Sequence, residues 1–380
     1  MSPPDVGWSF RTLLNPVVAR MLIYGASPFD LERVLRRVED TPLRNAQQLE
    51  SLWLTEWEAL AHQWRERSRD AAHRMRCSTA RDTSFQASAC GLAQFLINSA
   101  EISRKSQSYA AYSEDYRKAA DYFGSRVLSL DIPFGEQASL PALLHLPDRN
   151  RPHPCVAIFA GLGSCKEEMN TLARFMVERG IAALVPDMPG SGASLFRESI
   201  VCSSENLSKA FRAVADFAHG SSEIDPEQFG AVGLCMGGGY AYRACFEDHR
   251  YRFCATLFPL FINQVADDAT PRWMKSGTWY DYQTGGQAPQ HFVSEVGWHD
   301  GFSIDCPFLM VHGKYDNWMT LERATILFEH ARSPVRQMIV IDEEPVYASG
   351  NVITHTMPVG EQMGWVGPLV ADWVREQVGG

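Results

Sequence analysis

The sequence lacks the features that associate a protein with membranes or with nucleic acids. No apolar run in its 380 residues approaches the roughly 20 residues that a membrane-spanning helix needs. The net charge is −10 and no basic run interrupts the chain, so neither a nucleic acid nor an anionic membrane is expected as a partner. The first residues have neither the basic flank nor the apolar core of a secretory signal. We therefore expect a cytoplasmic protein.

Motifs for metals and nucleotides are also missing. The nine cysteines are scattered without paired spacing, which is typical of reduced thiols, and no Cys-x-x-Cys or His-Glu-x-x-His motif indicates a metal site. Gly-Lys-Ser/Thr is absent, which excludes a Walker loop. Gly161-x-Gly163 followed by Asp187 superficially fits a dinucleotide site, but Lys166 stands where the third glycine would be. We expect no metal and no bound cofactor.

The chain divides into two regions of different periodicity. Up to about residue 124, apolar residues recur at helical spacing, and from there on short apolar strands alternate with helices. The second pattern is typical of a mainly parallel sheet covered on both faces. We therefore predict a helical, cap-like domain over 1–124 and an α/β catalytic domain over 125–380. The expected strands of that domain are 127–130, 140–146, 155–159, 181–185, 229–234, 253–257, 308–311 and 337–341.

One long irregular stretch is predicted to be an insertion at the carboxyl edge of this sheet, where ligands of such sheets bind. It covers about 263–305 and is rich in aromatic residues. Two interpretations remain open, a wall of the substrate site and an insertion whose aromatic residues simply pack. The aromatic residues concerned are Trp273, Trp279, Tyr280, Tyr282, Phe292 and Trp298.

The motif that points to chemistry is Gly233-Leu234-Cys235-Met236-Gly237. It follows an expected strand and precedes a stretch with helical periodicity, which is the order of the nucleophile elbow of α/β-hydrolases. In that turn the central residue adopts a strained backbone and exposes its side chain, and flanking glycines avoid a clash of β-carbons. Cys235 is therefore the candidate nucleophile. The alternative is a glycine-rich turn that contains an inert, buried cysteine.

An acid and a histidine follow the elbow in the order that such nucleophiles require. Asp316 lies in the loop after the expected strand 308–311, and His355 is the only histidine beyond the last expected strand, 337–341. We therefore predict a catalytic triad in which His355 takes the proton of Cys235 and Asp316 orients the imidazole ring.

Other roles remain open for these and neighbouring residues. Asp316 could instead cap a helix that begins near Thr320, and His355 could be a solvated loop residue. Asp342 is the alternative acid. His312, at the end of its strand, is expected to pack beneath the site.

An oxyanion hole is expected from the loop after the first parallel strand, because its glycines allow the main chain to approach a substrate. We predict that the N–H groups of Leu162 and Met236 converge on the developing oxyanion.

Four motifs together resemble one branch of the α/β-hydrolases, the 2,6-dihydroxypseudooxynicotine hydrolase-like enzymes, which include polyketide-shortening hydrolases of pigment and anthraquinone biosynthesis. The most specific motif is the string Gly-Leu-Gly-Ser-Cys-Lys-Glu-Glu at 161–168. The others are Asp-Met-Pro-Gly-Ser-Gly at 187–192, the elbow at 233–237, and His-Gly-x-x-Asp at 312–316. The resemblance covers nearly the whole chain, because that family also carries an N-terminal helical domain.

This resemblance implies an α/β-hydrolase fold with the active site in a cleft between two domains. It also implies hydrolysis of a carbon–carbon bond beside a ketone, a retro-Claisen cleavage through an acyl-enzyme. The implied triad is Cys235, Asp316 and His355, with Leu162 and Met236 as oxyanion donors. The chain departs from the family at Cys235, where the family motif has serine.

The thiol leaves several functions open. A thiol beside a histidine and at a helix N-terminus ionises more readily than a free one, and its thioester can pass an acyl group to acceptors other than water. The alternatives to carbon–carbon bond hydrolysis are therefore an acyltransferase or cyclase, a thioesterase, and a non-catalytic binding protein. The expected partner is an aromatic or polyketide-like small molecule, and its binding as a thioester is left open. A homodimer remains open.

Overall fold

The structure is a computed structural model that describes residues 10–97, 102–148, 152–161, 163–261, 263, 282–299, 301–346, 354–355 and 357–379. The chain forms two compact units. The first consists of Met1–Gly124 and Val346–Val352, and the second consists of Ser125–Pro345 and Ile353–Gly380. None of the described helices is long and apolar enough to span a membrane.

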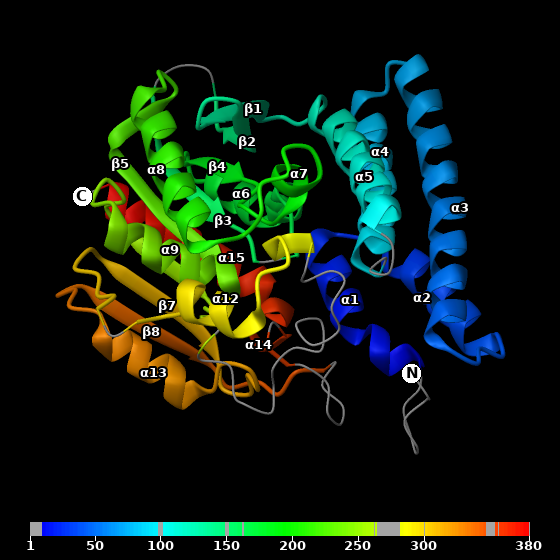
Figure 1. Ribbon diagram of the computed structural model, residues 1–380. Coiled ribbons are helices and arrows are strands. Elements are labelled where there is room, and N and C mark those ends of the chain that lie inside the picture. The colour runs from blue at the N-terminus through cyan, green and yellow to red at the C-terminus, as the bar shows by residue number, and fades with distance from the viewer. Residues whose placement is uncertain are drawn as a thin grey trace. The chain divides into compact units, whose positions relative to one another are not determined.

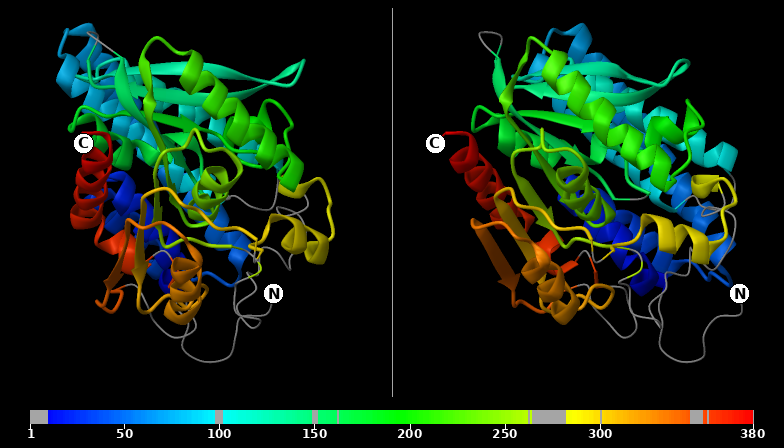
Figure 2. Two further views of the ribbon diagram at one scale, coloured as in Figure 1. Left: turned by 90° about the vertical axis from the view of Figure 1, so that its left-hand side faces the viewer. Right: turned by 60° about the vertical axis from the view of Figure 1, so that its left-hand side comes forward.

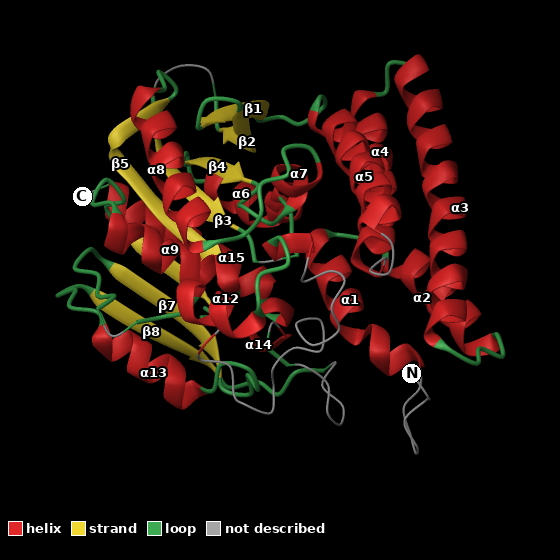
Figure 3. Ribbon diagram, viewed as in Figure 1, coloured by secondary structure: helices red, strands yellow, loops and turns green. Residues whose placement is uncertain are grey.

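The secondary structure described in the first unit is entirely helical (Figure 3). Its long helices pack side by side, α4 lying against both α3 and α5 (Figure 1). The approach of α4 to α5 requires Gly91, because a β-carbon there would lie 2.9 Å from the Cα atom of Tyr112. Trp53, Trp57 and Phe95 are fully buried and belong to the core between these helices. The helices are α1 (Phe10–Tyr24), α2 (Pro28–Asp40), α3 (Ala46–His73), α4 (Cys77–Ile97) and α5 (Ile102–Ala120).

The second unit is built on one eight-stranded sheet in the order β1-β2-β4-β3-β5-β6-β7-β8. The pairs β1–β2 and β2–β4 are antiparallel, and every other neighbouring pair is parallel, as the sequence predicts. The sheet is twisted, as both views of Figure 2 show. The strands are β1 (Arg126–Phe134), β2 (Ala138–Leu146), β3 (His153–Phe159), β4 (Ala182–Pro186), β5 (Ile224–Leu234), β6 (Cys254–Leu257), β7 (Phe308–Gly313) and β8 (Arg336–Ile341).

Helices cover both faces of this sheet. Ala157 and Phe159 of β3 belong to the core formed with α8 and α9, whereas the alternate residues Val156 and Ile158 are equally buried. On the opposite face α6 packs against α15, where Gly367 leaves room for a phenylalanine ring of α6 (Figure 1). The helices are η1 (Lys166–Met169), α6 (Asn170–Val177), α7 (Gly192–Phe196), α8 (Ser204–Gly220), α9 (Met236–Glu247), α12 (Pro289–Val296), α13 (Leu321–His330), α14 (Met357–Glu361) and α15 (Met363–Val378).

Several strands are longer than the sequence predicts, and among the parallel ones β5 exceeds its predicted bounds most. β5 begins at Ile224 rather than at Phe229, although residues 225–228 are polar or proline. Pairing with β3 extends the strand, because Ile224 lies opposite His153 across an irregularity in the register. The strand still ends at Leu234, so the residue that follows it is placed as predicted.

Candidate active site

Cys235 occupies a sharp turn between β5 and α9. Its backbone has φ 57° and ψ −128°, a conformation that residues with a side chain rarely adopt. The glycines on either side are required by close packing. A β-carbon at Gly233 would lie 1.9 Å from the carbonyl oxygen of Gly237, and one at Gly237 would lie 1.9 Å from that of Phe159. The side chain of Cys235 remains partly accessible in this turn.

Asp316 and His355 form a buried hydrogen-bonded pair. His355 Nδ1 donates to Asp316 Oδ2 over 2.7 Å, and both side chains are almost completely shielded from solvent. The other carboxylate oxygen, Oδ1, accepts the main-chain N–H groups of Trp318 and Met319, each at 2.9 Å. These bonds hold the carboxylate while it orients the imidazole ring. Asp316 follows β7, and His355 lies in the loop beyond β8.

Cys235 acts electrostatically on the histidine. Nε2 of His355 has no partner within ordinary hydrogen-bond distance in the described part of the chain. Cys235 is nevertheless close enough to affect the ring. Burial by itself lowers the pKa of His355, but the interactions of the ring with Asp316 and Cys235 outweigh burial and raise the pKa to about 10. The ring therefore holds a proton more strongly than a free imidazole does.

The loop after β3 also reaches the sulfur. A β-carbon built on Gly161 would lie 3.2 Å from Cβ and 3.3 Å from Sγ of Cys235. This places the main chain of the expected oxyanion loop beside the thiol. Leu162, one predicted oxyanion donor, lies outside the described residues. Met236, the other, is the buried first residue of α9, where N–H groups have no acceptor within the helix.

Two aromatic residues contact the imidazole of His355, and sequence reasoning identified neither. The ring of Trp318 is stacked on it with centroids 5.4 Å apart and planes 17° apart. Phe258 makes a T-shaped contact at 5.6 Å and 87°. The one signal for Trp318 was its place two residues after the predicted acid. The positive φ of Phe258, 38°, has no signal in the sequence.

The alternative acid and the neighbouring histidine have other surroundings. Asp342 is exposed and pairs with Lys314 over 2.6 Å, whereas Asp316 is the carboxylate bonded to His355. His312 is fully buried, as predicted, and its Nε2 donates to the carbonyl oxygen of Met319 over 2.8 Å. Burial lowers the pKa of His312, so that ring is neutral at pH 7.

A buried charge cluster supports the loop that leads away from Gly161. The ammonium group of Lys166 lies 2.9 Å from carboxylate oxygens of both Glu167 and Asp187. Asp187 also accepts the main-chain N–H groups of Lys166 and Ala193, each at 2.8 Å. The carboxylate that resembled a ribose-binding acid is thus engaged in holding two loops of the protein together.

The predicted insertion at 263–305 is described only in part. Trp273, Trp279 and Tyr280 lie outside the described residues, so their role as a substrate wall stays a prediction. Phe292, on α12, is fully buried in the core of the sheet unit. For this residue the packed interpretation is correct.

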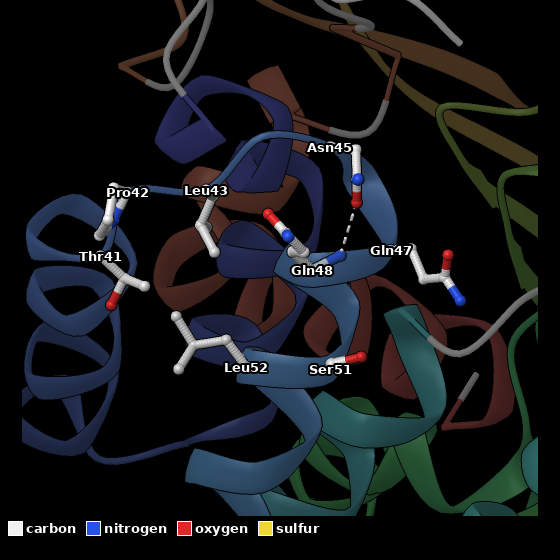
Figure 4. A pocket seen from close by; sticks show the side chains of 8 residues that line it. All are labelled: Thr41, Pro42, Leu43, Asn45, Gln47, Gln48, Ser51 and Leu52. Atoms are coloured by element: carbon white, nitrogen blue, oxygen red, sulfur yellow. Dashed lines mark hydrogen bonds between the residues drawn. The ribbon is translucent and has the colours of Figure 1, made fainter.

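The larger of two pockets described in the helical unit lies at the connection of α2 and α3 (Figure 4). It has a volume of about 520 Å³ and contains none of the predicted catalytic residues. Polar groups of its lining bond to one another: the side-chain oxygen of Asn45 accepts a hydrogen bond from the main-chain N–H of Gln48 over 2.9 Å. In the described part of the chain, no three His, Cys, Asp or Glu side chains group as a metal site requires. The lining residues are Thr41, Pro42, Leu43, Asn45, Gln47, Gln48, Ser51 and Leu52.

Comparison with known proteins identifies the family. The 2,6-dihydropseudooxynicotine hydrolase of Paenarthrobacter nicotinovorans is 25% identical over 270 residues, which cover 70% of this chain and 72% of that protein. The esterase FrsA of Vibrio vulnificus strain YJ016 is 28% identical over 248 residues, which cover 61% of this chain and 57% of that protein. The match therefore spans little more than half of the FrsA sequence. The family described as "Esterase FrsA-like" matches residues 44–275, more than half of the chain. This chain belongs to the FrsA-like esterase family.

Solved structures show which fold this family member has. The crystal structure of the 2,6-dihydroxy-pseudo-oxynicotine hydrolase superposes with a TM-score of 0.78 over 95% of each chain, at 21% identity. AbyA5 superposes with a TM-score of 0.54 over 83% of this chain and 92% of its own, at 16% identity. The hyperthermophilic esterase from Pyrobaculum calidifontis superposes with a TM-score of 0.51 over 73% of this chain and 94% of its own, at 15% identity. The fold is that of the α/β-hydrolases, as the sequence predicts.

Proposed function

We propose that this FrsA-like protein is a hydrolase that forms an acyl-thioester on Cys235. In this proposal His355 transfers the protons and Asp316 holds its ring. The observation that supports it most directly is the buried Asp316–His355 pair, bonded over 2.7 Å, beside a cysteine in the strained turn between β5 and α9. A nucleophile, a base and a group that orients the base are the three parts that covalent catalysis requires.

In the first half of the reaction, the sulfur attacks a carbonyl carbon of the substrate. His355 takes the proton of the Cys235 thiol, and its raised pKa of about 10 keeps that proton on the ring while the sulfur attacks. The carbonyl becomes a tetrahedral oxyanion, for which Met236 at the start of α9 offers a main-chain N–H. As the intermediate collapses, the bond to the leaving group breaks, and His355 donates its Nε2 proton to that group.

In the second half, water hydrolyses the thioester. Acylation removes the ionisable sulfur of Cys235, whose interaction with the ring is one of the causes of the raised His355 pKa. The pKa of His355 is then lower than in the free enzyme, and its ring, now neutral at Nε2, accepts a proton from the attacking water. Collapse of the second tetrahedral intermediate releases a carboxylic acid, and the proton on His355 restores the starting state of the site.

We infer that the bond cleaved is a carbon–carbon bond beside a ketone, in an aromatic or polyketide-like small molecule. The whole-chain similarity to a 2,6-dihydroxy-pseudo-oxynicotine hydrolase supports this choice. A carbon leaving group departs as a carbanion or enolate and must be protonated. A histidine that already carries the proton is suited to this step. Ester hydrolysis is the other outcome that the family supports.

The second candidate function is acyl transfer, and the cysteine itself favours it. A thioester passes its acyl group to an alcohol, amine or carbanion more readily than an oxygen ester does, so an acceptor that excludes water would be acylated instead. The chemistry up to the acyl-enzyme is the same. The two functions therefore differ only in the group that discharges Cys235.

Intact-protein mass spectrometry after incubation with candidate ketones, esters and thioesters tests the proposal. We expect an added acyl mass that maps to Cys235 and that, once formed, persists longer in His355→Ala, which cannot activate water. An adduct elsewhere, or reversible binding with no adduct in either protein, would reject the acyl-enzyme and favour a binding protein. Turnover in ¹⁸O-labelled water distinguishes the two functions, because only hydrolysis places a labelled oxygen in a carboxylate product.

A further inference from the structure

Trp318 contacts both the acid and the histidine of the proposed triad. Its ring is stacked on the imidazole of His355, at 5.4 Å between centroids and 17° between planes, and only 9% of the residue is exposed. Its main-chain N–H donates to Oδ1 of Asp316 over 2.9 Å, while the opposite oxygen accepts His355 Nδ1 over 2.7 Å. One residue thus holds the carboxylate through its backbone and the imidazole through its side chain.

Phe258 contacts the same imidazole from a different direction. Its ring makes a T-shaped contact with His355, at 87° between planes. Its backbone has φ 38°, which is strained for a bulky residue, and a hydrogen bond of 2.7 Å from its N–H to the carbonyl oxygen of Val311 in β7 holds it there. The imidazole therefore has two aromatic neighbours, one of them parallel to its own plane.

We propose that Trp318 is a positioning residue, whose indole ring fixes the plane of the His355 imidazole and stabilises its protonated form. The proposal rests on the triad proposed above. The negative face of an indole attracts a cation, and the attraction strengthens where water is excluded. His355 is 1% exposed, so the stacked indole replaces water on that face of the ring. The imidazole can rotate about its own bonds only by losing this contact.

The other groups that act on His355 are not changed by replacing the indole. They are the Asp316 carboxylate, the Cys235 sulfur and the buried His312 ring, which senses the charge of His355. The Asp316 bond to residue 318 also survives, because every residue except proline keeps the main-chain N–H. Substitution at 318 therefore isolates what the aromatic side chain contributes.

The test compares Trp318→Phe with Trp318→Leu, two apolar side chains that both cover the imidazole but differ in having a ring. Titration of His355 is followed by NMR, and its signals are assigned by their absence from His355→Asn. We expect the midpoint in Trp318→Leu to lie roughly half to one pH unit below that in Trp318→Phe. Equal midpoints in the two variants would overturn the proposal. If Trp318→Leu does not fold, Trp318→Met provides the same comparison.

Trp373→Leu is the matched control. Trp373 is buried in the same unit and packs against Phe253 in a T-shaped pair. Its replacement should lower stability and leave the His355 midpoint unchanged. A shift as large as that in Trp318→Leu would mean that any loosening of the unit moves the midpoint, and it would reject a specific role for Trp318.

A kinetic measurement separates this inference from the proposed function. With p-nitrophenyl acetate as the probe, Trp318→Leu should lower kcat about tenfold with little change in KM, and Trp318→Phe should restore most of the loss. A loss confined to KM would contradict positioning. If His355→Asn hydrolyses the probe as fast as the unsubstituted protein, the triad itself is wrong. If only the Trp318 variants are without effect, the triad stands and the inference about Trp318 falls.

Discussion

Two glycines beside Cys235 should respond to the same substitution in opposite ways. A methyl group on Gly237 would lie 1.9 Å from the carbonyl oxygen of Phe159, and one on Gly161 would lie 3.3 Å from Sγ of Cys235. The first distance is far below any contact that real β-carbons make. The second is only slightly shorter than an ordinary van der Waals contact. Gly237→Ala therefore tests the packing of the turn, and Gly161→Ala tests the space in front of the sulfur.

The magnitudes follow from how far the backbone must move. In Gly237→Ala the end of β3 and the start of α9 must separate by more than 1 Å, and the obstructing atoms are main-chain atoms. We expect a loss of at least about 3 kcal/mol, the upper end of ordinary overpacking, or a failure to fold. In Gly161→Ala a shift of a few tenths of an ångström relieves the contact, and stability should fall by less than about 1 kcal/mol.

Gly161→Ala, which should fold, is expected to lose activity. The methyl group at position 161 either pushes the thiol aside or occupies the path of the incoming carbonyl. We expect both the alkylation of Cys235 by iodoacetamide and the hydrolysis of p-nitrophenyl acetate to slow about tenfold, which is about 1.4 kcal/mol of barrier. Stability is measured by urea unfolding. Gly220→Ala is the control, because nothing lies within 4 Å of the added β-carbon.

Two results would refute this reasoning. Undiminished stability of Gly237→Ala would mean that β3 and α9 are not packed around the turn as closely as described. Undiminished alkylation and turnover in Gly161→Ala would mean that the loop after β3 does not border the reactive side of the sulfur. The expected oxyanion site in that loop would then be wrong as well.

Three further predictions concern His355, Lys166 and Cys235 in the sheet unit. His355 has a pKa raised to about 10 from an ordinary 6.5, so the stability it contributes is complete below pH 6.5 and is lost as the pH rises through 10. The difference in free energy of unfolding between the unsubstituted protein and His355→Asn, measured in urea, should therefore shrink from pH 6 to pH 10. A constant difference would contradict this prediction. Lys166→Met leaves two carboxylates buried without their cation and should lower the free energy of unfolding by about 3–5 kcal/mol. Lys209→Met removes an exposed pair with Glu205 and should change stability little in the same assay. Cys235→Ala and His355→Ala should each lower turnover by orders of magnitude and the double variant by little more, whereas additive losses would show that the two residues act separately.

Sequence alone determined the elements that depend on local pattern. The parallel strands appear as short apolar runs because both of their faces are buried, and this pattern survives without knowledge of their partners. The turn at Cys235 could be located because Gly233 is required by a contact within five consecutive residues and Gly237 by one with the end of β3. The order Cys235, Asp316 and His355 was predictable for a related reason, since each residue follows a recognisable strand.

Tertiary structure decided what depends on residues distant in the chain. Asp316 and Asp342 both follow a strand, and only folding brings one to His355 while the other meets Lys314 at the surface. Trp318 and Phe258 come together on one imidazole from different loops, which no periodicity encodes. The protonation of His355 is likewise a tertiary property. A histidine in a polar loop carries no such signal, and its pKa is raised only because folding buries it beside Asp316 and Cys235, whose interactions with the ring outweigh the cost of burying its charge.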